Sequence, residues 1–378
     1  MKYIILGAGG TGGILGFYMT KAGKDVTLIA RNAHLEVMKK QGLSVEKMWT
    51  NETETIPVSA ESMESYEAKG EKADVILVCV KKYSLDSCIP FIQNISHKNT
   101  IVVSVLNVYG TGAYLQEKLP ELLVTDGCIY VSANIKQPGV LLQHGEILRV
   151  FFGVREKEDL KKFNTKFDTK YDVKKKIPEQ IKIDLIEEDK IKKGTSQEKK
   201  EVQIQLNLSE KDELDIKKLN GQINSEYKAE ILLKTIAQDF KDSGIDGILS
   251  DNIKRDTLTK FSYVSPIGTA GLYLHAVAGD FQQESEAREL FKTLIREIVT
   301  LSNAMGVTFE EDLVERNLKI LSNLPEETTT SMQRDVMEGK QSEIDGLVYE
   351  VVRMANKYEV EVPAYERAEE KFREMGLK

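Results

Sequence analysis

The part of this sequence that most restricts its fold is the beginning, where a short apolar run leads directly into a cluster of glycines. The run YIILG precedes a segment of small and apolar residues with a helical pattern. The turn between them consists of Gly7, Ala8, Gly9, Gly10, Thr11 and Gly12 and fits G-x-G-x-x-G. Between a strand and a helix this pattern predicts a dinucleotide-binding loop, because glycines allow a tight turn, close approach of a pyrophosphate and close packing of helix on strand. The alternative is a turn that only connects the two elements.

The end of the second predicted strand indicates which dinucleotide the loop would hold. The pyrophosphate would lie on the free N–H groups at the start of the helix. An NAD site usually offers an acidic residue to the ribose about 20 residues further on. Here the strand VTLIA ends in Arg31 and Asn32, and no acid follows until Glu36. Because Arg31 can form charge-assisted bonds to a 2′-phosphate, the sequence favours NADPH. The alternative is an ordinary exposed charge at a strand end.

Residues 1–155 alternate short apolar runs with helical segments. The runs ADVILVCVK, TIVVSVLN and CIYVSANI are almost continuously apolar, which is typical of strands covered on both faces. The alternation predicts an α/β fold with a Rossmann-type, doubly wound parallel sheet. The segment GVLLQHGEILRVFFG predicts a closing hairpin that turns near His144.

The rest of the chain differs in composition and in the spacing of its apolar residues. Residues 156–228 are rich in charges of both signs and poor in large apolar residues, so we interpret them as a charged insertion or mobile excursion rather than a third folded domain. Residues 229–378 carry apolar residues at spacings of three and four, which predicts an all-helical domain.

The overall charge and the apolar runs exclude several function classes. A net charge of −8 argues against nucleic acid or a membrane surface as partner. No apolar run approaches the roughly 18 residues needed to span a bilayer. Cys79, Cys88 and Cys128 have no metal or redox spacing, which favours buried side chains in a reducing cytoplasm. The histidines are scattered, so we expect no metal site.

Several spaced motifs resemble the ketopantoate reductases (2-dehydropantoate 2-reductases). The motifs are ILGAGGTGG with LIARNAHLE, LVCVKKYSLD, VLNVYGTG, PGVLLQHGEI, DNIKRDTLTKF and TTSMQRDVMEGKQSEIDGL. Together they cover both ends of the chain and leave out mainly the charged segment. The resemblance implies NADPH-dependent reduction of a 2-oxo acid, with ketopantoate and pantothenate synthesis as the leading assignment. It also implies that the helical domain 229–378 binds the substrate and carries catalytic residues. The resemblance also makes assembly of the chain as a homodimer possible.

The resemblance also implies roles for individual residues. Lys260 would donate a proton to the carbonyl oxygen on which charge develops during hydride transfer. Glu343 would hold the substrate hydroxyl or orient Lys260, and Ser331 would bind the substrate carboxylate. Asn107 would orient the nicotinamide or Lys260, while Lys81 would contact the cofactor or an acidic substrate. Without the resemblance, these residues would be interpreted as helix-face charges, caps or loop residues.

The sequence departs from the family pattern around the substrate. Val264 and Gly268 stand where the family usually has asparagines, and Val108 stands where it has a glycine. A less polar pocket would favour a less polar 2-oxo acid. Two alternatives therefore stay open: a reductase or dehydrogenase of another 2-oxo or 2-hydroxy acid, and an NADPH-binding sensor without turnover whose charged segment serves as an interaction arm.

Overall fold

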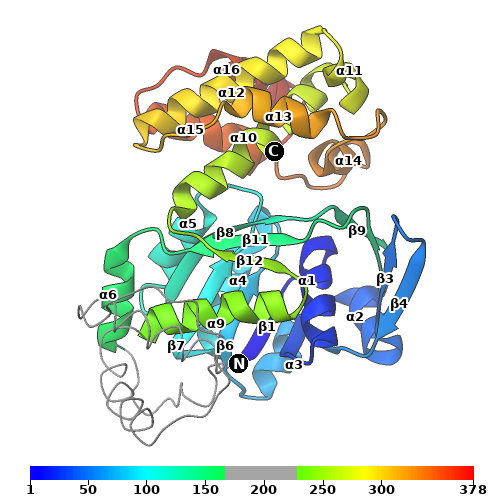
Figure 1. The fold of residues 1–378 in the computed structure, drawn as a ribbon, viewed down its shortest axis with the longest axis vertical. Coiled ribbons are helices and arrows are strands. Elements are labelled where there is room, and N and C mark those ends of the chain that lie inside the picture. Colours follow the sequence, from blue (N-terminus) through cyan, green and yellow to red (C-terminus); the bar gives the residue numbers. More distant parts are fainter. Residues whose placement is uncertain (167–227) are drawn as a thin grey trace, which may run out of the picture.

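The computed structural model describes residues 1–166 and 228–378, which form two halves joined at helix α10 (Ile253–Leu274) (Figure 1). We call the described residues up to Leu249 the sheet half and those from Ile253 onward the helical half. Figure 1 shows the N-terminus in the sheet half and the C-terminus in the helical half. The predicted fold class, a Rossmann-type sheet followed by a helical domain, is confirmed.

The larger sheet of the described residues has eight strands in the order β12-β11-β8-β7-β6-β1-β2-β5. Their bounds are β1 Lys2–Leu6, β2 Asp25–Ile29, β5 Ser59–Glu61, β6 Ala73–Val78, β7 Ser96–Ser104, β8 Leu123–Tyr130, β11 Arg149–Gly153 and β12 Asp246–Leu249. Neighbouring strands run parallel, except that β11 is antiparallel to β8. The carboxyl ends of the parallel strands thus meet at one edge, where α/β sheets bind ligands.

Both faces of this sheet are buried, which explains the continuous apolar runs. Along β1, Tyr3 and Ile5 belong to one hydrophobic cluster, whereas Ile4 and Leu6 belong to a second cluster on the opposite face. The covering helices are α1 Gly10–Lys21, α2 Asn32–Gln41, α3 Met63–Ala68, α4 Leu85–Ile95, α5 Thr111–Lys118, α6 Lys157–Lys166 and α9 Lys228–Asp242, with the short 3-10 helix η1 Lys82–Ser84.

A smaller four-stranded sheet packs against the start of α1. Its order is β4-β3-β10-β9, with bounds β3 Leu43–Lys47, β4 Glu52–Ile56, β9 Ala133–Gln137 and β10 Val140–Gln143. A Cβ atom on Gly10 would lie 2.5 Å from the carbonyl oxygen of Ala133, so only glycine allows β9 to pack this closely.

The hairpin predicted near His144 is wrong. Strand β10 pairs with β3 and β9 in the small sheet, whereas β11 pairs with β8 and β12 in the large sheet. The residues around His144 therefore cross from one sheet to the other. Alternating apolar residues predict that a strand forms, but they do not identify its partner.

The sheet half extends further along the chain than residue 155, the boundary expected from the sequence. Strand β12 pairs in parallel with β11, and α9 contributes Leu232, Ile236 and Phe240 to a core cluster shared with the sheet. The stretch 229–249 therefore belongs to the sheet half, not to the helical domain. The prediction for 156–228 falls mostly outside the described residues, but its first part forms α6, which buries Phe163.

The helical half packs around α10 and α12. Its elements are α11 Ala278–Gln282, α12 Glu286–Ala304, α13 Leu313–Leu321, α14 Ser331–Met337, the π-helical turn η3 Asp345–Tyr349, α15 Glu350–Lys357 and α16 Pro363–Glu374. Phe261, Phe291 and Tyr365 lie in its core. None of the helices in the two described ranges has the length and apolar character needed to cross a membrane.

Candidate active site

The glycine loop lies at the carboxyl edge of the large sheet, between β1 and α1. Gly7 has φ 104°, which favours glycine, and a Cβ on Gly12 would lie only 2.1 Å from the carbonyl oxygen of Gly7. No side chain caps the start of α1, and its first turn holds no acid. A Cβ on Gly9 would meet no protein atom within 4 Å, so the space beside it is open. Free N–H groups next to open space fit the phosphates of a dinucleotide.

Arg31 lies beside this loop. It follows β2 and precedes α2, and the pairing of Leu6 with Ile29 brings the ends of β1 and β2 together. The side chain is exposed, and it forms no ion pair within the described parts of the chain. Arg31 is thus available to an anionic group on a dinucleotide held by the loop.

Lys260 and Asn107 come together from different halves. Lys260 lies on α10 with 9% of its surface exposed, and its Nζ donates to Asn107 Oδ1 at 2.6 Å. The ammonium also lies 5.8 Å from the centre of the Tyr130 ring. Burial lowers the pKa of Lys260 from its ordinary value of 10.5, although Cys128 and Glu343 oppose the shift. Both residues line a pocket at the carboxyl end of the sheet, where a lysine of lowered pKa can act as a proton donor.

Glu343 pairs with Lys81 rather than touching Lys260. Only 4% of Glu343 is exposed; its Oε2 accepts from Lys81 Nζ at 2.9 Å and its Oε1 from the N–H of Lys82 at 3.2 Å. Asp335 lies 3.6 Å from the same Lys81 Nζ. Burial alone would lower the pKa of Lys81, but the carboxylates of Glu343 and Asp335 outweigh it and raise the pKa. This pair also joins the two halves.

Ser331 takes part in neither of these two pairs. It is the exposed first residue of α14, whose N-cap is Thr330, and it lies one turn before Asp335 on the same helix face. Helix α14 also explains why residue 268 is a glycine: a Cβ there would lie only 2.9 Å from Met332 Cε. Val264 is half-buried one turn earlier on α10. An apolar methionine therefore borders the helix face on which the family usually has asparagines.

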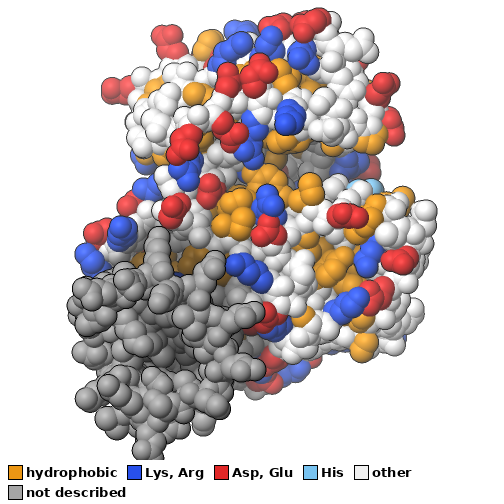
Figure 2. Space-filling model, in the orientation of Figure 1, with side chains coloured by type: hydrophobic (Ala, Val, Ile, Leu, Met, Phe, Trp, Pro, Cys, Tyr) orange, Lys and Arg blue, Asp and Glu red, His pale blue; other side chains and the backbone are white. Residues whose placement is uncertain are grey.

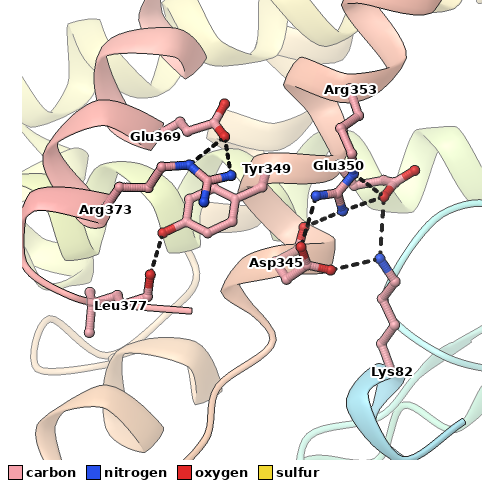
Figure 3. Close-up of polar contacts among 8 residues, drawn as sticks. All are labelled: Lys82, Asp345, Tyr349, Glu350, Arg353, Glu369, Arg373 and Leu377. Atoms are coloured by element: carbon pink, nitrogen blue, oxygen red, sulfur yellow. Dashed lines mark hydrogen bonds and ion pairs between the residues drawn. The ribbon is translucent and has the colours of Figure 1, made fainter.

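A polar network beside the Lys81–Glu343 pair ties the two halves together (Figure 3). Lys82 Nζ lies 3.0 Å from Asp345 Oδ2 and 3.3 Å from Glu350 Oε2. Arg353 holds the same two carboxylates, at 2.8 and 2.5 Å. Figure 2 shows the waist at which the halves meet. Because these side chains are partly exposed, each ion pair contributes little alone. Together they hold η1, which carries Lys82, against η3 and α15 of the helical half.

A close apolar contact reinforces this junction. Val108, from the loop that carries Asn107, belongs to the core of the helical half. A Cβ on Gly346 would lie 2.5 Å from Val108 Cγ2 and 2.9 Å from Lys82 Cδ. Gly346 therefore lets the two loops of the sheet half approach the helical half. The valine that departs from the family pattern fills the space that this glycine leaves.

Replacing Gly346 with alanine is expected to lower the free energy of unfolding by about 1–3 kcal/mol, because the added methyl group overpacks the junction. Denaturant unfolding would measure the change. A second substitution, Val108→Ala, should recover part of the loss. Gly145→Ala is a matched control, because a Cβ there meets nothing within 4 Å. Equal stability of Gly346→Ala and Gly145→Ala would contradict the close contact.

The sequence analysis missed Lys82, Tyr130 and Gly346. Lys82 lies next to a predicted site residue, but its partners are more than 260 positions away. Tyr130 gave no signal beyond its place at a strand end. Gly346 lies in the motif EIDGL, inside an apolar helical pattern, where a glycine can indicate close packing.

Comparisons with known proteins agree with this arrangement. Two family models match, "Ketopantoate reductase PanE/ApbA" over residues 3–157 and "Ketopantoate reductase PanE/ApbA C terminal" over residues 252–375. The 2-dehydropantoate 2-reductase of Pyrococcus horikoshii is 33% identical over 38% of this chain and 45% of that enzyme. The 2-dehydropantoate 2-reductase of Mesorhizobium japonicum is 23% identical over 96% of this chain and 94% of that enzyme.

Solved structures share the fold. A PanE/ApbA family ketopantoate reductase from Ralstonia eutropha has a TM-score of 0.71 at 21% identity, over 99% of this chain and 97% of that one. D-mandelate dehydrogenase, solved with NADH and anilino(oxo)acetate, has a TM-score of 0.67 at 18% identity, over 98% and 96% of the two chains. At these identities the likeness establishes the architecture alone.

Proposed function

The chain belongs to the ketopantoate reductase family of pyridine-nucleotide-dependent oxidoreductases, and on that premise we propose that it uses NADPH to reduce a 2-oxo acid. We propose 2-dehydropantoate (ketopantoate) as the substrate and pantoate as the product, which would place the enzyme in pantothenate synthesis in the cytoplasm. The observation that carries the proposal is the buried Lys260, held by Asn107 in a pocket at the edge of the sheet that also bears the glycine loop.

Lys260 would supply the proton for the reaction. When bound, NADPH would supply a hydride to the carbonyl carbon of the substrate. Negative charge then develops on the carbonyl oxygen, which requires a positioned proton donor. Burial makes the Lys260 ammonium a better acid, and its bond to Asn107 leaves its other N–H groups free for the substrate oxygen.

Two further residues would hold the substrate. Glu343 would accept a hydrogen bond from the substrate hydroxyl, with its carboxylate held in place by Lys81 and the N–H of Lys82. Ser331 would donate to the substrate carboxylate from the exposed start of α14. Lys81 would contribute positive charge toward the anionic substrate or cofactor.

We also propose that the chain assembles as a homodimer.

The assignment of NADPH rests on Arg31 and the glycine loop. The loop offers the uncapped start of α1, and the open space beside Gly9 leaves room for a pyrophosphate. Arg31 follows β2, where its guanidinium is free to bind a 2′-phosphate, and no acid occupies this strand end.

The first test follows NADPH consumption, and then NADH consumption, by the purified protein with ketopantoate and a panel of other 2-oxo acids. Turnover of ketopantoate with NADPH at least tenfold faster than with any other pair is the expected result. Turnover of a different acid alone would keep the chemistry and remove the assignment to pantothenate synthesis. No turnover with bound NADPH would favour the sensor alternative.

One observation favours a second candidate substrate class. Met332 fills the space beside Gly268, and the half-buried Val264 lies one turn before it, so the face of α10 beyond Lys260 carries apolar groups instead of amides. An apolar surface binds a hydroxylated chain less well than an aliphatic or aromatic one. A reductase or dehydrogenase of a less polar 2-oxo or 2-hydroxy acid is therefore the alternative that the panel must include.

A further inference from the structure

His34 connects the glycine loop to the small sheet. It lies in the first turn of α2, half-buried, with its Nε2 2.9 Å from the carbonyl oxygen of Ala8. Its other ring nitrogen, Nδ1, accepts from the N–H of Gly139 at 2.9 Å, in the turn between β9 and β10. One imidazole thus spans from the middle of the loop to a fixed turn of the sheet.

These two contacts determine the form of the ring. Nδ1 must carry a lone pair because its partner is an N–H donor, so the proton must be on Nε2, from which it is donated to the Ala8 oxygen. A second proton on Nδ1 would oppose the N–H of Gly139. Burial lowers the pKa of His34 in spite of the favourable bond to Ala8, which agrees with a neutral ring at neutral pH.

The turn that holds His34 is itself anchored. Gly139 has φ 77°, and its carbonyl oxygen accepts from the N–H of Ser44 at 2.9 Å in β3. The small sheet also packs on α1, where a Cβ on Gly13 would lie 2.6 Å from Leu141 Cδ1. The ring therefore connects the loop to a turn that is itself hydrogen-bonded to β3.

Holding the Ala8 carbonyl has a direct consequence for Gly9. The carbonyl of Ala8 and the N–H of Gly9 belong to one peptide unit, which is trans because the described chain has no cis peptide bonds. In a trans peptide the C=O and N–H point in opposite directions. When His34 holds the carbonyl on one side, the Gly9 N–H points to the other side.

We propose that His34 is a positioning residue that orients the Ala8–Gly9 peptide so that the Gly9 N–H is presented to a phosphate of the bound dinucleotide. This inference rests on the proposed function for its ligand. Its geometry rests on the two contacts of the ring and on the open space beside Gly9. Loss of the ring would let the peptide rotate, and binding would then have to supply the cost of orienting it.

The ring geometry can be tested on the cofactor-free protein by ¹⁵N NMR of the histidine side chains, with His34→Ala used to assign the signal. The expected result at neutral pH is a neutral imidazole with its proton on Nε2. A ring that is charged, or that carries its proton on Nδ1, would overturn the proposal. This readout does not depend on any activity or ligand.

The consequence for binding is tested by the dissociation constant of NADPH. His34→Ala is expected to raise it about tenfold, because orienting hydrogen bonds are lost, while kcat at saturating cofactor stays within twofold. His34→Gln keeps a donor that can reach Ala8 and should recover part of the affinity. It also serves as the folded variant if His34→Ala is unstable.

His97→Ala is the matched control. His97 is also half-buried, accepts a backbone N–H at Nδ1 and contacts Asp74 through Nε2, but it lies at the amino end of β7, at the opposite edge of the sheet. Its loss should leave NADPH affinity within twofold. Equal affinity in wild type, His34→Ala and His34→Gln would overturn the proposal for His34 alone. Failure of the wild type to bind NADPH or NADH would instead overturn the proposed function.

Discussion

Replacing Lys260 with alanine is expected to lower kcat by roughly 10²–10⁴-fold, while NADPH affinity stays within about threefold. Lys260 is the buried cation of the pocket, and its contact with Asn107 directs it from the helical half toward the edge of the sheet. The glycine loop and Arg31 lie elsewhere along this edge, so removing the ammonium should leave cofactor binding intact.

The measurement pairs steady-state kcat on the preferred 2-oxo acid with the dissociation constant of NADPH. Lys254→Ala is the matched control, because Lys254 lies on the same helix but forms an exposed ion pair with Glu156. A normal kcat in Lys260→Ala would remove the role assigned to it. Equal losses in both variants would indicate damage to α10 rather than loss of an acid.

The pH profile adds an independent test of the same residue. A proton donor works only when protonated, so the rate should be present below the pKa of Lys260 and lost as the pH rises through it. Because burial lowers that pKa from 10.5, the loss should begin at a lower pH than for an exposed lysine. This alkaline limb should be absent from the residual activity of Lys260→Ala.

Replacing Arg31 with alanine is expected to weaken NADPH binding roughly 10- to 100-fold and to leave NADH binding nearly unchanged. The two cofactors differ only in the 2′-phosphate, and a hydrogen bond to a charged group contributes about 1.5–3 kcal/mol. Arg31 is exposed beside the glycine loop, with no ion pair in the described ranges to restrain it.

Fluorescence titration of both cofactors against wild type and variant would measure this change in preference. Lys40→Ala is a suitable control, since Lys40 is an exposed cation at the far end of α2. An equal loss for NADPH and NADH would mean that Arg31 supports the loop instead of reading the phosphate. Unchanged NADPH affinity in Arg31→Ala would show that Arg31 does not bind the 2′-phosphate.

Much of the fold was predictable because local pattern and burial agree. The residues of β1 alternate between two buried clusters, so its sequence has to be apolar throughout, and the glycine loop leaves a distinctive trace. The partner of each strand was not predictable in the same way. The wrong hairpin at His144 and the misplaced stretch 229–249 both depend on which strand β11 and β12 pair with, and that is decided by tertiary packing.

The candidate site was predictable residue by residue only through family resemblance. The bond between Lys81 and Glu343 joins positions 262 apart in the chain, and nothing local to either residue indicates it. His34 looked like one scattered histidine among four, because its role depends on a carbonyl and an N–H that any sequence would supply. Hydrogen bonds to backbone groups cannot be inferred from the types of residue that supply those groups.

The two central contacts of the site each take one partner from each half: Asn107 with Lys260, and Lys81 with Glu343. On the proposed chemistry, the sheet half binds the hydride donor NADPH, and the helical half carries the proton donor Lys260. A molecule whose two halves do not pack together would therefore bind NADPH without oxidising it.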